Sequence, residues 1–331
     1  MSYDPNVLRQ ATARLEQQRL QRADRAEQTR QRAYAKQPRL AQIDRELRAT
    51  VAAAATAALR QGVDPAPALA ALKEKNLDLQ DERNVLLGAM GLLPSELEDS
   101  PACVDCGDTG WLGATMCRCL HELCKQEQIR ALSSLLDLGE QSFEAFRMDY
   151  YSTQHDPAVG TSPRENMEEF VFPMCLNYAR NFGQRATRNL FLYGAPGLGK
   201  TYLSACIARV VSEQGHSVVY DTAGNIFARF EAQKFNRDPD ARDETRRYLN
   251  CDLLIMDDLG CELTTQFTQS ALYELINTRL ITGRHTVISS NLTMDDVSRR
   301  YSPQIASRLE GEYHPLHFFG SDIRLLSKNA Y

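Results

Sequence analysis

The residues Gly194, Ala195, Pro196, Gly197, Leu198, Gly199, Lys200 and Thr201 spell G-x-x-x-x-G-K-T, a complete phosphate-binding loop. Its glycines let the backbone bend closely, so that successive N–H groups point at phosphate oxygens. Lys200 supplies a positive charge for the β- and γ-phosphates, and the Thr201 hydroxyl can bind Mg²⁺. A glycine-rich turn could match the pattern by accident, so the residues around the loop decide the interpretation.

The residues on either side of the loop predict a strand before it and a helix after it. Residues 190–193 form an apolar run that is typical of a buried parallel strand. Leu203, Ile207 and Val210 recur at helical spacing, and Gly215 is a signal for the end of a helix. Because this order puts the phosphates at a helix N-terminus, the sequence predicts a nucleoside triphosphate site in an α/β fold.

Two further predicted strands end in polar side chains. Residues 252–256 are mostly apolar and lead into Asp257, which is placed to hold Mg²⁺ through water, and Asp258, which is placed to orient and deprotonate the attacking water. Residues 285–290 lead into Asn291, whose amide could bond that water or the γ-phosphate. Acids at a strand end can serve solubility alone, but behind a complete phosphate loop we interpret them as part of the chemistry.

Two arginines follow these strands. Ser302 and Pro303 predict the start of a helix, and that helix carries Arg308. Arg324 lies in the C-terminal tail. Single arginines are usually surface residues, and nothing in the spacing of these two makes either one catalytic.

Composition predicts a globular part with a polar, basic extension. Hydrophobic residues make up 43% of the 331 residues, and the net charge is −5 although residues 1–48 carry eleven Arg and Lys against six Asp and Glu. This basic arm could contact nucleic acid or an acidic partner, and a solvated helix explains it equally well. The sequence contains no apolar stretch long enough to cross a bilayer and no secretion signal. With nine cysteines, the chain is expected in a reducing, cytoplasmic compartment.

The N-terminal part of the sequence predicts three helices. Residues 4–36 favour a helix that buries little, and Pro38 ends it. A second helix with an apolar stripe starts near Leu40, and Asp64 and Pro65 predict the N-cap and first position of a third. The third helix carries seam positions of a short antiparallel hairpin or coiled coil at residues 69, 72, 76, 79, 83, 86 and 90. Polar Asn76 and Arg83 either fix the register of this seam or indicate that it is displaced by one residue. We interpret the region as a partner-binding helical module.

Four cysteines within 17 residues have the spacing C-x₂-C-x₁₀-C-x-C, namely Cys103, Cys106, Cys117 and Cys119. Two close pairs separated by a hairpin-length segment can bring four thiolates to one tetrahedral Zn²⁺. Buried thiols or a redox C-x-x-C pair are the alternatives, and neither explains four cysteines in a segment so poor in apolar residues. His121 and Cys124 are possible substitute ligands. The remaining cysteines are expected as core residues, namely Cys175, Cys206, Cys251 and Cys261.

The motifs together resemble a known family. The loop GAPGLGKT, the strands LLIMDDLG and ISSN, and the helix IASRLEGEY are similar to those of AAA+ helicase loaders of the DnaC/DnaI type, and equally to transposition helper ATPases of the IstB type. Residues 34–47, the cysteine cluster and residues 162–167 resemble the longer, zinc-containing DnaC-like proteins. The resemblance implies an AAA+ P-loop NTPase with a parallel five-stranded sheet, preceded by a helical, coiled-coil-like region and a small zinc-binding module. The domains would be residues 1–98 (helical), 99–125 (zinc-binding), 126–165 (connector) and 166–331 (ATPase).

The resemblance also implies roles for particular residues. The loop would be the Walker A motif, with Tyr202 next to it in the nucleotide site, and Asp257 and Asp258 would be the Walker B pair. Asn291 would be sensor 1, Arg324 sensor 2, and Arg308 an arginine finger that acts on the nucleotide of a neighbouring subunit. Many AAA+ proteins have Glu where this chain has Asp258, and the shorter side chain reaches the water less well. Hydrolysis is therefore expected to be slow and stimulated by DNA or by a partner.

The expected function is an ATP-dependent loader of a replicative DnaB-type helicase onto single-stranded DNA. ATP, Mg²⁺ and Zn²⁺ would be its cofactors, and the ATPase domain would self-associate. A transposition helper with a transposase as partner is the alternative within the same fold. A nucleotide-gated adaptor that hardly hydrolyses ATP is a third possibility, suggested by Asp258.

Overall fold

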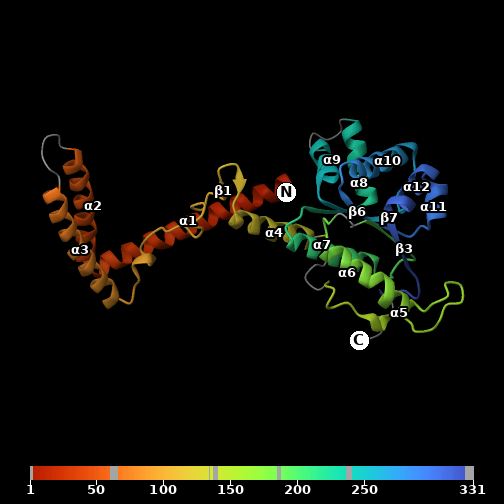
Figure 1. Ribbon diagram of the computed structural model, residues 1–331, viewed down its shortest axis with the longest axis horizontal. Coiled ribbons are helices and arrows are strands. Elements are labelled where there is room, and N and C mark those ends of the chain that lie inside the picture. The colour runs from red at the N-terminus through yellow and green to blue at the C-terminus, as the bar shows by residue number, and fades with distance from the viewer. Residues whose placement is uncertain are drawn as a thin grey trace. The chain divides into compact units, whose positions relative to one another are not determined.

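The computed structural model describes residues 3–59, 66–133, 135–136, 141–184, 188–235 and 241–324. The chain divides into two compact units, one of residues 12–120 and one that combines residues 1–11 with 121–331 (Figure 1). Helices α1 (Pro5–Lys36) and α4 (Arg118–Ser133) each run from one unit into the other. None of the described helices combines the length and the apolar character that a membrane span requires. The four-part division of the chain stays a prediction.

The smaller unit contains the predicted helical hairpin. Helix α2 (Pro38–Leu59) packs along α3 (Ala66–Ala89), and Ala33, Leu40, Leu87 and Leu97 form a small core. Leu97 follows the 3₁₀ turn η1 (Pro94–Glu96) and is buried, although the sequence around it reads as a polar linker. The predicted N-cap at Asp64 lies outside the described residues.

The polar residues of the hairpin seam face one another across it. The side-chain amide of Asn76 donates a hydrogen bond to the Thr50 hydroxyl over 2.8 Å, and Arg83 pairs with Asp44 over 2.8 Å. The predicted seam is therefore in register, and its polar residues are satisfied by partners on α2.

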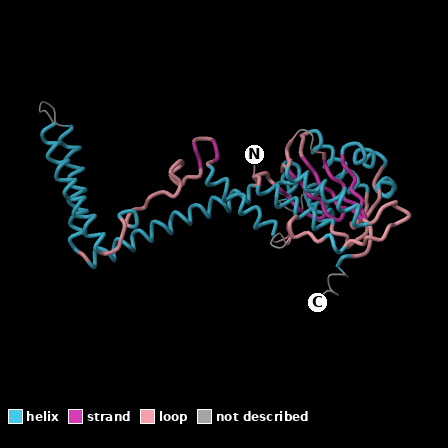
Figure 2. The backbone as a smooth tube through the Cα atoms, turned by 60° about the horizontal axis from the view of Figure 1, so that its bottom comes forward, coloured by secondary structure: helices cyan, strands magenta, loops and turns pink. Residues whose placement is uncertain are grey.

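The larger unit is built on a five-stranded parallel sheet with the strand order β4-β5-β6-β3-β7. This confirms the predicted sheet, and Figure 2 shows its strands lying between helices. The strands are β3 (Asn189–Gly194), β4 (Val218–Thr222), β5 (Leu253–Leu259), β6 (His285–Ser290) and β7 (Tyr313–Phe318). The helices are α5 (Pro163–Asn166), η3 (Met167–Val171), α6 (Phe172–Arg180), α7 (Lys200–Glu213), α8 (Ala223–Lys234), α9 (Ala241–Asn250), α10 (Gln266–Ile281), α11 (Met294–Arg300) and α12 (Pro303–Glu312), with the 3₁₀ turn η2 at Met148–Tyr150.

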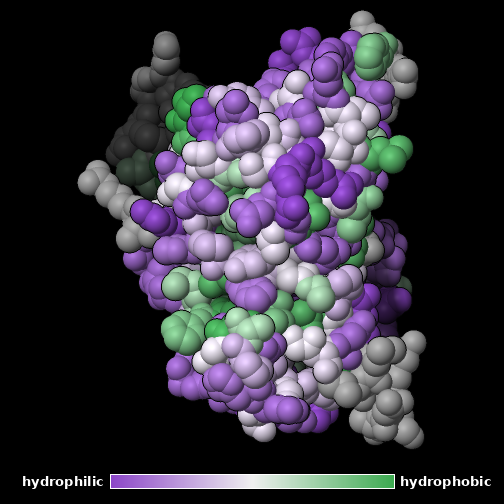
Figure 3. Space-filling model, turned by 90° about the vertical axis from the view of Figure 1, so that its right-hand side faces the viewer, coloured by the Kyte–Doolittle hydropathy of each residue, from purple (hydrophilic) through white to green (hydrophobic). Residues whose placement is uncertain are grey.

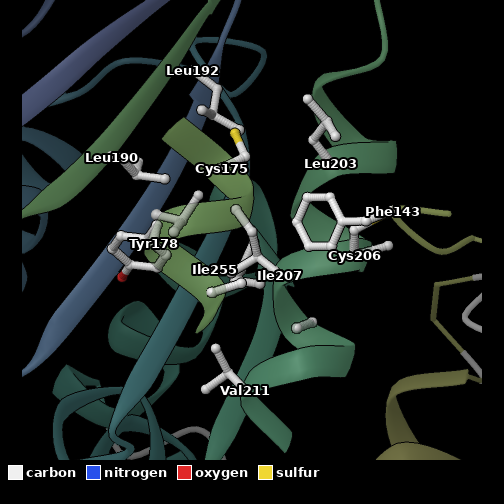
Figure 4. Close-up of a cluster of buried hydrophobic side chains, with 14 of the residues drawn as sticks. Phe143, Cys175, Tyr178, Leu190, Leu192, Leu203, Cys206, Ile207, Val211 and Ile255 are labelled. Atoms are coloured by element: carbon white, nitrogen blue, oxygen red, sulfur yellow. The ribbon is translucent and has the colours of Figure 1, made fainter. Parts of the chain in front are cut away.

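Both faces of the sheet are covered, which explains why its strands are apolar runs without alternation. Leu190 and Leu192 of β3 belong to one core with helices α6 and α7, and Figure 4 shows this core with Cys175 and Ile207 among its members. Phe191 points to the opposite face and belongs to a second core with α8 to α12. The face turned to the viewer in Figure 3 is mostly hydrophilic, with hydrophobic side chains gathered below its middle.

Candidate functional site

The phosphate loop connects the end of β3 to the start of α7, as its sequence predicts. Gly194 has φ +143°, and a Cβ there would lie 1.9 Å from the carbonyl oxygen of Phe318 on β7. Gly197 has φ +78°, and a Cβ there would lie 1.9 Å from a carboxylate oxygen of Asp322. Both positions therefore favour glycine, Gly194 because the β7 backbone leaves no room for a Cβ and Gly197 because a positive φ strains residues with a side chain.

Lys200 links the loop to the end of β6. Its buried ammonium group donates hydrogen bonds to the carbonyl oxygens of Gly194 (2.6 Å) and Ala195 (2.8 Å) and to Oδ1 of Asn291 (2.9 Å). Burial lowers the pKa of Lys200, whereas the nearby charges of Asp258 and Asp257 raise it. The predicted loop lysine and the predicted sensor asparagine are thus brought together, since β3 and β6 are neighbours in the sheet.

Asp257 lies almost fully buried at the end of β5, with 2% of its surface exposed. Its carboxylate accepts hydrogen bonds from the hydroxyls of Tyr220 (2.6 Å), Thr201 (3.1 Å) and Ser289. Burial raises the pKa of Tyr220, so its hydroxyl keeps the proton that it donates. A carboxylate fixed in this way beside the Thr201 hydroxyl is oriented to hold a cation at the loop.

The adjacent residue, Asp258, is turned outward by an irregularity in the strand. The pairing of β5 with β6 shifts register between Met256 and Leu259, and Asp258 has φ +56°. A bulge of this kind re-aims side chains and is common beside active sites. Asp258 is exposed to the cavity, and burial together with the charge of Asp257 raises its pKa, which makes it a stronger proton acceptor.

The two predicted arginines lie in different places. Arg324 lines the same cavity as the loop, Asp258 and Asn291. Arg308, on α12, is not among the residues lining this cavity, and its guanidinium lies over the ring of Tyr273, 5.0 Å from the centroid. Arg324 therefore lies at the cavity beside the phosphate loop, and Arg308 does not line it.

Sequence reasoning missed one wall of the site. The cavity has a volume of about 690 Å³, and residues from the predicted connector line it, namely Gln141, Ala145, Phe146, Arg147, Tyr150 and Tyr151. Tyr151 donates a hydrogen bond to the carbonyl oxygen of Leu198 over 2.9 Å, which fixes this segment to the phosphate loop. The cluster of aromatic residues at 143–151 is the signal that could have found it, since aromatic rings suit a nucleotide base.

Residues 179–307 match the family model described as IstB-like ATP binding protein. This part of the chain is thus similar to the IstB-like ATP-binding family. Chromosomal replication initiator protein DnaA of Campylobacter fetus subsp. fetus (strain 82-40) is 30% identical over 151 residues, which are 46% of this chain and 30% of that protein. Replicative helicase loader DnaC of Buchnera aphidicola subsp. Baizongia pistaciae (strain Bp) is 26% identical over 117 residues, which are 35% of this chain and 47% of that protein. The chain therefore spans less than half the length of either relative.

A solved structure, the crystal structure of the DnaC helicase loader, aligns with a TM-score of 0.44 and 16% identity, over 55% of this chain and 99% of that one. The predicted resemblance to IstB-like proteins and to DnaC-type loaders is confirmed by the family model and the DnaC relative. The region that matches the family model contains the phosphate loop, both aspartates and Asn291, whereas Arg308 and Arg324 lie beyond its last matched residue.

The predicted cysteine ligands come together outside the region that matches the family model. The four sulfur atoms of Cys103, Cys106, Cys117 and Cys119 all lie within 4.8 Å of one another, with 3.6 Å between Cys103 and Cys117 and 3.4 Å between Cys106 and Cys119. Sulfurs about 3.7 Å apart are what a tetrahedron of Zn–S bonds near 2.3 Å requires. The short hairpin of β1 (Trp111–Leu112) and β2 (Thr115–Met116) separates the two pairs. The donor set and its geometry therefore fit Zn²⁺.

The other cysteine and histidine predictions have mixed outcomes. The Nδ1 atom of His121 is hydrogen-bonded to the Tyr3 hydroxyl over 2.8 Å, and Cys124 is buried, so neither belongs to the four-sulfur group. Cys175, Cys206 and Cys251 are buried as predicted. The prediction for Cys261 is wrong: it is exposed, because it lies beyond the end of β5 at Leu259. Its sulfur accepts a hydrogen bond from the Asn291 amide over 3.7 Å.

Asp108 anchors the cysteine cluster, and no motif predicted this. Its buried carboxylate accepts hydrogen bonds from the backbone N–H groups of Ala102 (3.0 Å) and Cys103 (2.9 Å) and pairs with Arg22 on α1. Asp108 also has φ +61°, so it turns the chain directly after the first cysteine pair. A carboxylate that holds the backbone of a metal ligand orients that ligand.

Proposed function

We propose that this chain is an ATP-dependent loader of a replicative DnaB-type helicase onto single-stranded DNA, with ATP binding and hydrolysis acting as a switch. The observation that carries the proposal is the network around Lys200, which joins the phosphate loop to Asn291 at the end of a neighbouring strand. A phosphate oxygen would compete for the Lys200 ammonium group, so nucleotide binding would change how these two segments are held together. The match to the IstB-like ATP-binding family and the DnaC relative support the same reading.

The proposed roles follow from position and chemistry. Residues 194–202 cradle the phosphates, and Thr201 and Asp257 hold Mg²⁺, which would supply charge neutralisation at the transferred phosphate. Asp258, exposed and with a raised pKa, accepts the proton of the attacking water, and Asn291 orients that water. Arg324 contacts the phosphates from within the same cavity.

Arg308 is proposed to act in trans, which requires self-association of the ATPase domain. This proposal is based on the position of Arg308, which lies outside the cavity lined by the other proposed site residues and donates a hydrogen bond to the Tyr273 hydroxyl. A guanidinium supplied by a neighbouring subunit would complete the site only in the assembly, so hydrolysis would depend on partner contacts.

A second cavity offers a surface for single-stranded DNA. It has a volume of about 540 Å³ between α8, α9 and α10, and its walls include Phe230, Lys234, Arg242, Arg246 and Phe267. The Lys234 ammonium group lies over the Phe267 ring, 5.0 Å from the centroid. Basic side chains with aromatic rings between them are the combination that binds single strands through phosphates and stacked bases.

A binding experiment tests the identity of the proposed partner. The full-length chain should co-purify with a DnaB-type helicase in the presence of ATP and Mg²⁺. A transposition helper is the second candidate, because the matching family model is described as IstB-like. Co-purification with a transposase and no binding to the helicase would replace the loader with that alternative.

Phosphate release tests the enzymatic part of the proposal. We expect slow release from the chain alone and faster release with single-stranded DNA or the helicase. No release under either condition, with ATP bound, would indicate the nucleotide-gated adaptor instead.

A further inference from the structure

The guanidinium of Arg308 contacts an aromatic side chain in place of a carboxylate. It donates a hydrogen bond to the hydroxyl of Tyr273 on α10 over 2.9 Å, and it lies over the Tyr273 ring, 5.0 Å from the centroid. Within the part of the chain that the structure describes, no ion pair joins Arg308 to a carboxylate. Arg299 on the preceding helix differs, because it pairs with Asp296 over 2.7 Å. The contacts of Arg308 are therefore polar and aromatic, and they leave its charge uncompensated.

The two contacts order the guanidinium and keep it ready for an anion. The hydrogen bond restricts its direction, and the attraction between cation and ring holds it against the tyrosine face. A carboxylate in the same place would compete with phosphate oxygens for the same N–H donors. An arginine that must reach a phosphate on another molecule gains from such an uncharged partner, because less side-chain freedom is lost when the phosphate is bound.

Both side chains lie where a second chain can meet them. Tyr273 is 38% exposed and Arg308 is half-buried, and neither lines the cavity beside the phosphate loop. Beneath them, the adjacent residues Leu272 on α10 and Leu309 on α12 are fully buried in the same core. That core fixes the backbone of both helices, so the Tyr273 side chain can set the direction of the guanidinium.

We infer that Tyr273 positions the Arg308 guanidinium for the nucleotide of a neighbouring chain. Tyr273 is thus a positioning residue that touches no substrate itself. The inference rests on the proposed function, because it assumes that Arg308 acts in trans. Without Tyr273 the guanidinium would sample more rotamers and would adopt the productive arrangement less often. The turnover number should fall, whereas ATP binding, to which Tyr273 does not contribute, should stay the same.

The first test measures phosphate release by the full-length chain with Mg²⁺ and single-stranded DNA over a range of ATP concentrations. Tyr273→Leu removes both contacts, so kcat should fall about tenfold and the KM for ATP should stay within about twofold. Tyr273→Phe keeps the ring and removes only the hydrogen bond, so it should retain roughly a third of kcat. Ile281→Ala trims an exposed apolar side chain of the same helix and is the control, which should change neither quantity. An unchanged or raised kcat in Tyr273→Leu would overturn the inference.

A mixing experiment tests whether Tyr273 acts through Arg308. The Asp258→Asn chain lacks the proposed proton acceptor and the Arg308→Ala chain lacks the proposed arginine finger, so only their mixed assembly should release phosphate. Tyr273→Leu should lower this release about tenfold in the Asp258→Asn chain, which donates Arg308, and should have no effect in the Arg308→Ala chain. Any other pattern would overturn the inference while the trans action of Arg308 stands.

Failure of the proposed function gives a different result, which is visible before Tyr273 is changed. If the mixture of Asp258→Asn and Arg308→Ala released no phosphate, Arg308 would not act on a neighbouring chain. The proposed trans action would then be wrong, and the role of Tyr273 would fall with it.

Discussion

The nucleotide site draws its residues from three parallel strands far apart in the sequence, whereas the cysteine cluster draws its four ligands from 17 consecutive residues. In the candidate nucleotide site, the sheet fixes the positions of the side chains. Lys200, Asp257 and Asn291 lie close together because β5, β6 and β3 are neighbouring strands. In the second, few apolar residues support the fold, so the metal itself would supply much of the stability. A site supported by a large core should therefore tolerate single changes that would dismantle a site supported by its ligand.

Loss of one zinc ligand should have the largest effect. Cys117→Ser removes one of four thiolates, and structural zinc sites of this kind contribute roughly 10–16 kcal/mol to local folding. We expect loss of the single bound zinc by metal analysis, while ATP affinity stays within about twofold because the nucleotide site has its own core. Cys261→Ser is the control, since this cysteine is exposed and outside the cluster. Retention of zinc in Cys117→Ser would contradict the site, and loss of ATP binding would contradict the independence of the two regions.

The next largest effect is expected from Arg308, and this variant tests whether the nucleotide site is complete within one chain. Arg308→Ala should leave ATP binding unchanged and reduce stimulated hydrolysis by about 10³–10⁵, the usual contribution of an arginine finger. Phosphate release with single-stranded DNA or the helicase measures this. Arg299→Ala, on the neighbouring helix α11, is the control because Arg299 is exposed and pairs only locally with Asp296 in the part described. Normal stimulated turnover in Arg308→Ala would show that the arginine finger lies elsewhere.

These two regions were predictable to different extents, for physical reasons. The sheet, the loop and the polar strand ends follow from apolar runs and local motifs. A strand that is buried on both faces is apolar throughout, so its own sequence is enough to recognise it. The wall at 141–151 was missed because it depends on the connector folding back, with Tyr151 reaching the Leu198 carbonyl. Asp108 was missed because its partner, Arg22, lies 86 residues away and belongs to a helix whose sequence suggests either a solvated surface or contact with another molecule. Local spacing predicts ligands, whereas the residues that hold them come from tertiary contacts.

A moderate effect on zinc affinity is expected from a change at Asp108, whose carboxylate holds the backbone of the cysteine cluster. Asp108→Asn keeps the shape but removes the charge that pairs with Arg22 and holds the Cys103 backbone, so zinc affinity should fall about 10–100-fold. Competition with a chromophoric chelator measures this change. Asp105→Asn, at an exposed position between the first two cysteines, is the control. Unchanged zinc affinity in Asp108→Asn would mean that the cluster needs no support from α1.

The smallest effect belongs to a single hydrogen bond at the nucleotide site. Tyr151→Phe leaves the Leu198 carbonyl without its buried donor, so the free energy of unfolding should fall by about 1–2 kcal/mol and ATP affinity several-fold. Tyr178→Phe is the matched control, because Tyr178 is buried in the same core and its hydroxyl has no hydrogen-bond partner among the described residues. Denaturant unfolding and ATP titration should therefore separate two chemically identical substitutions. If both variants lost the same free energy of unfolding and the same ATP affinity, the hydrogen bond between Tyr151 and Leu198 would contribute nothing specific to either quantity.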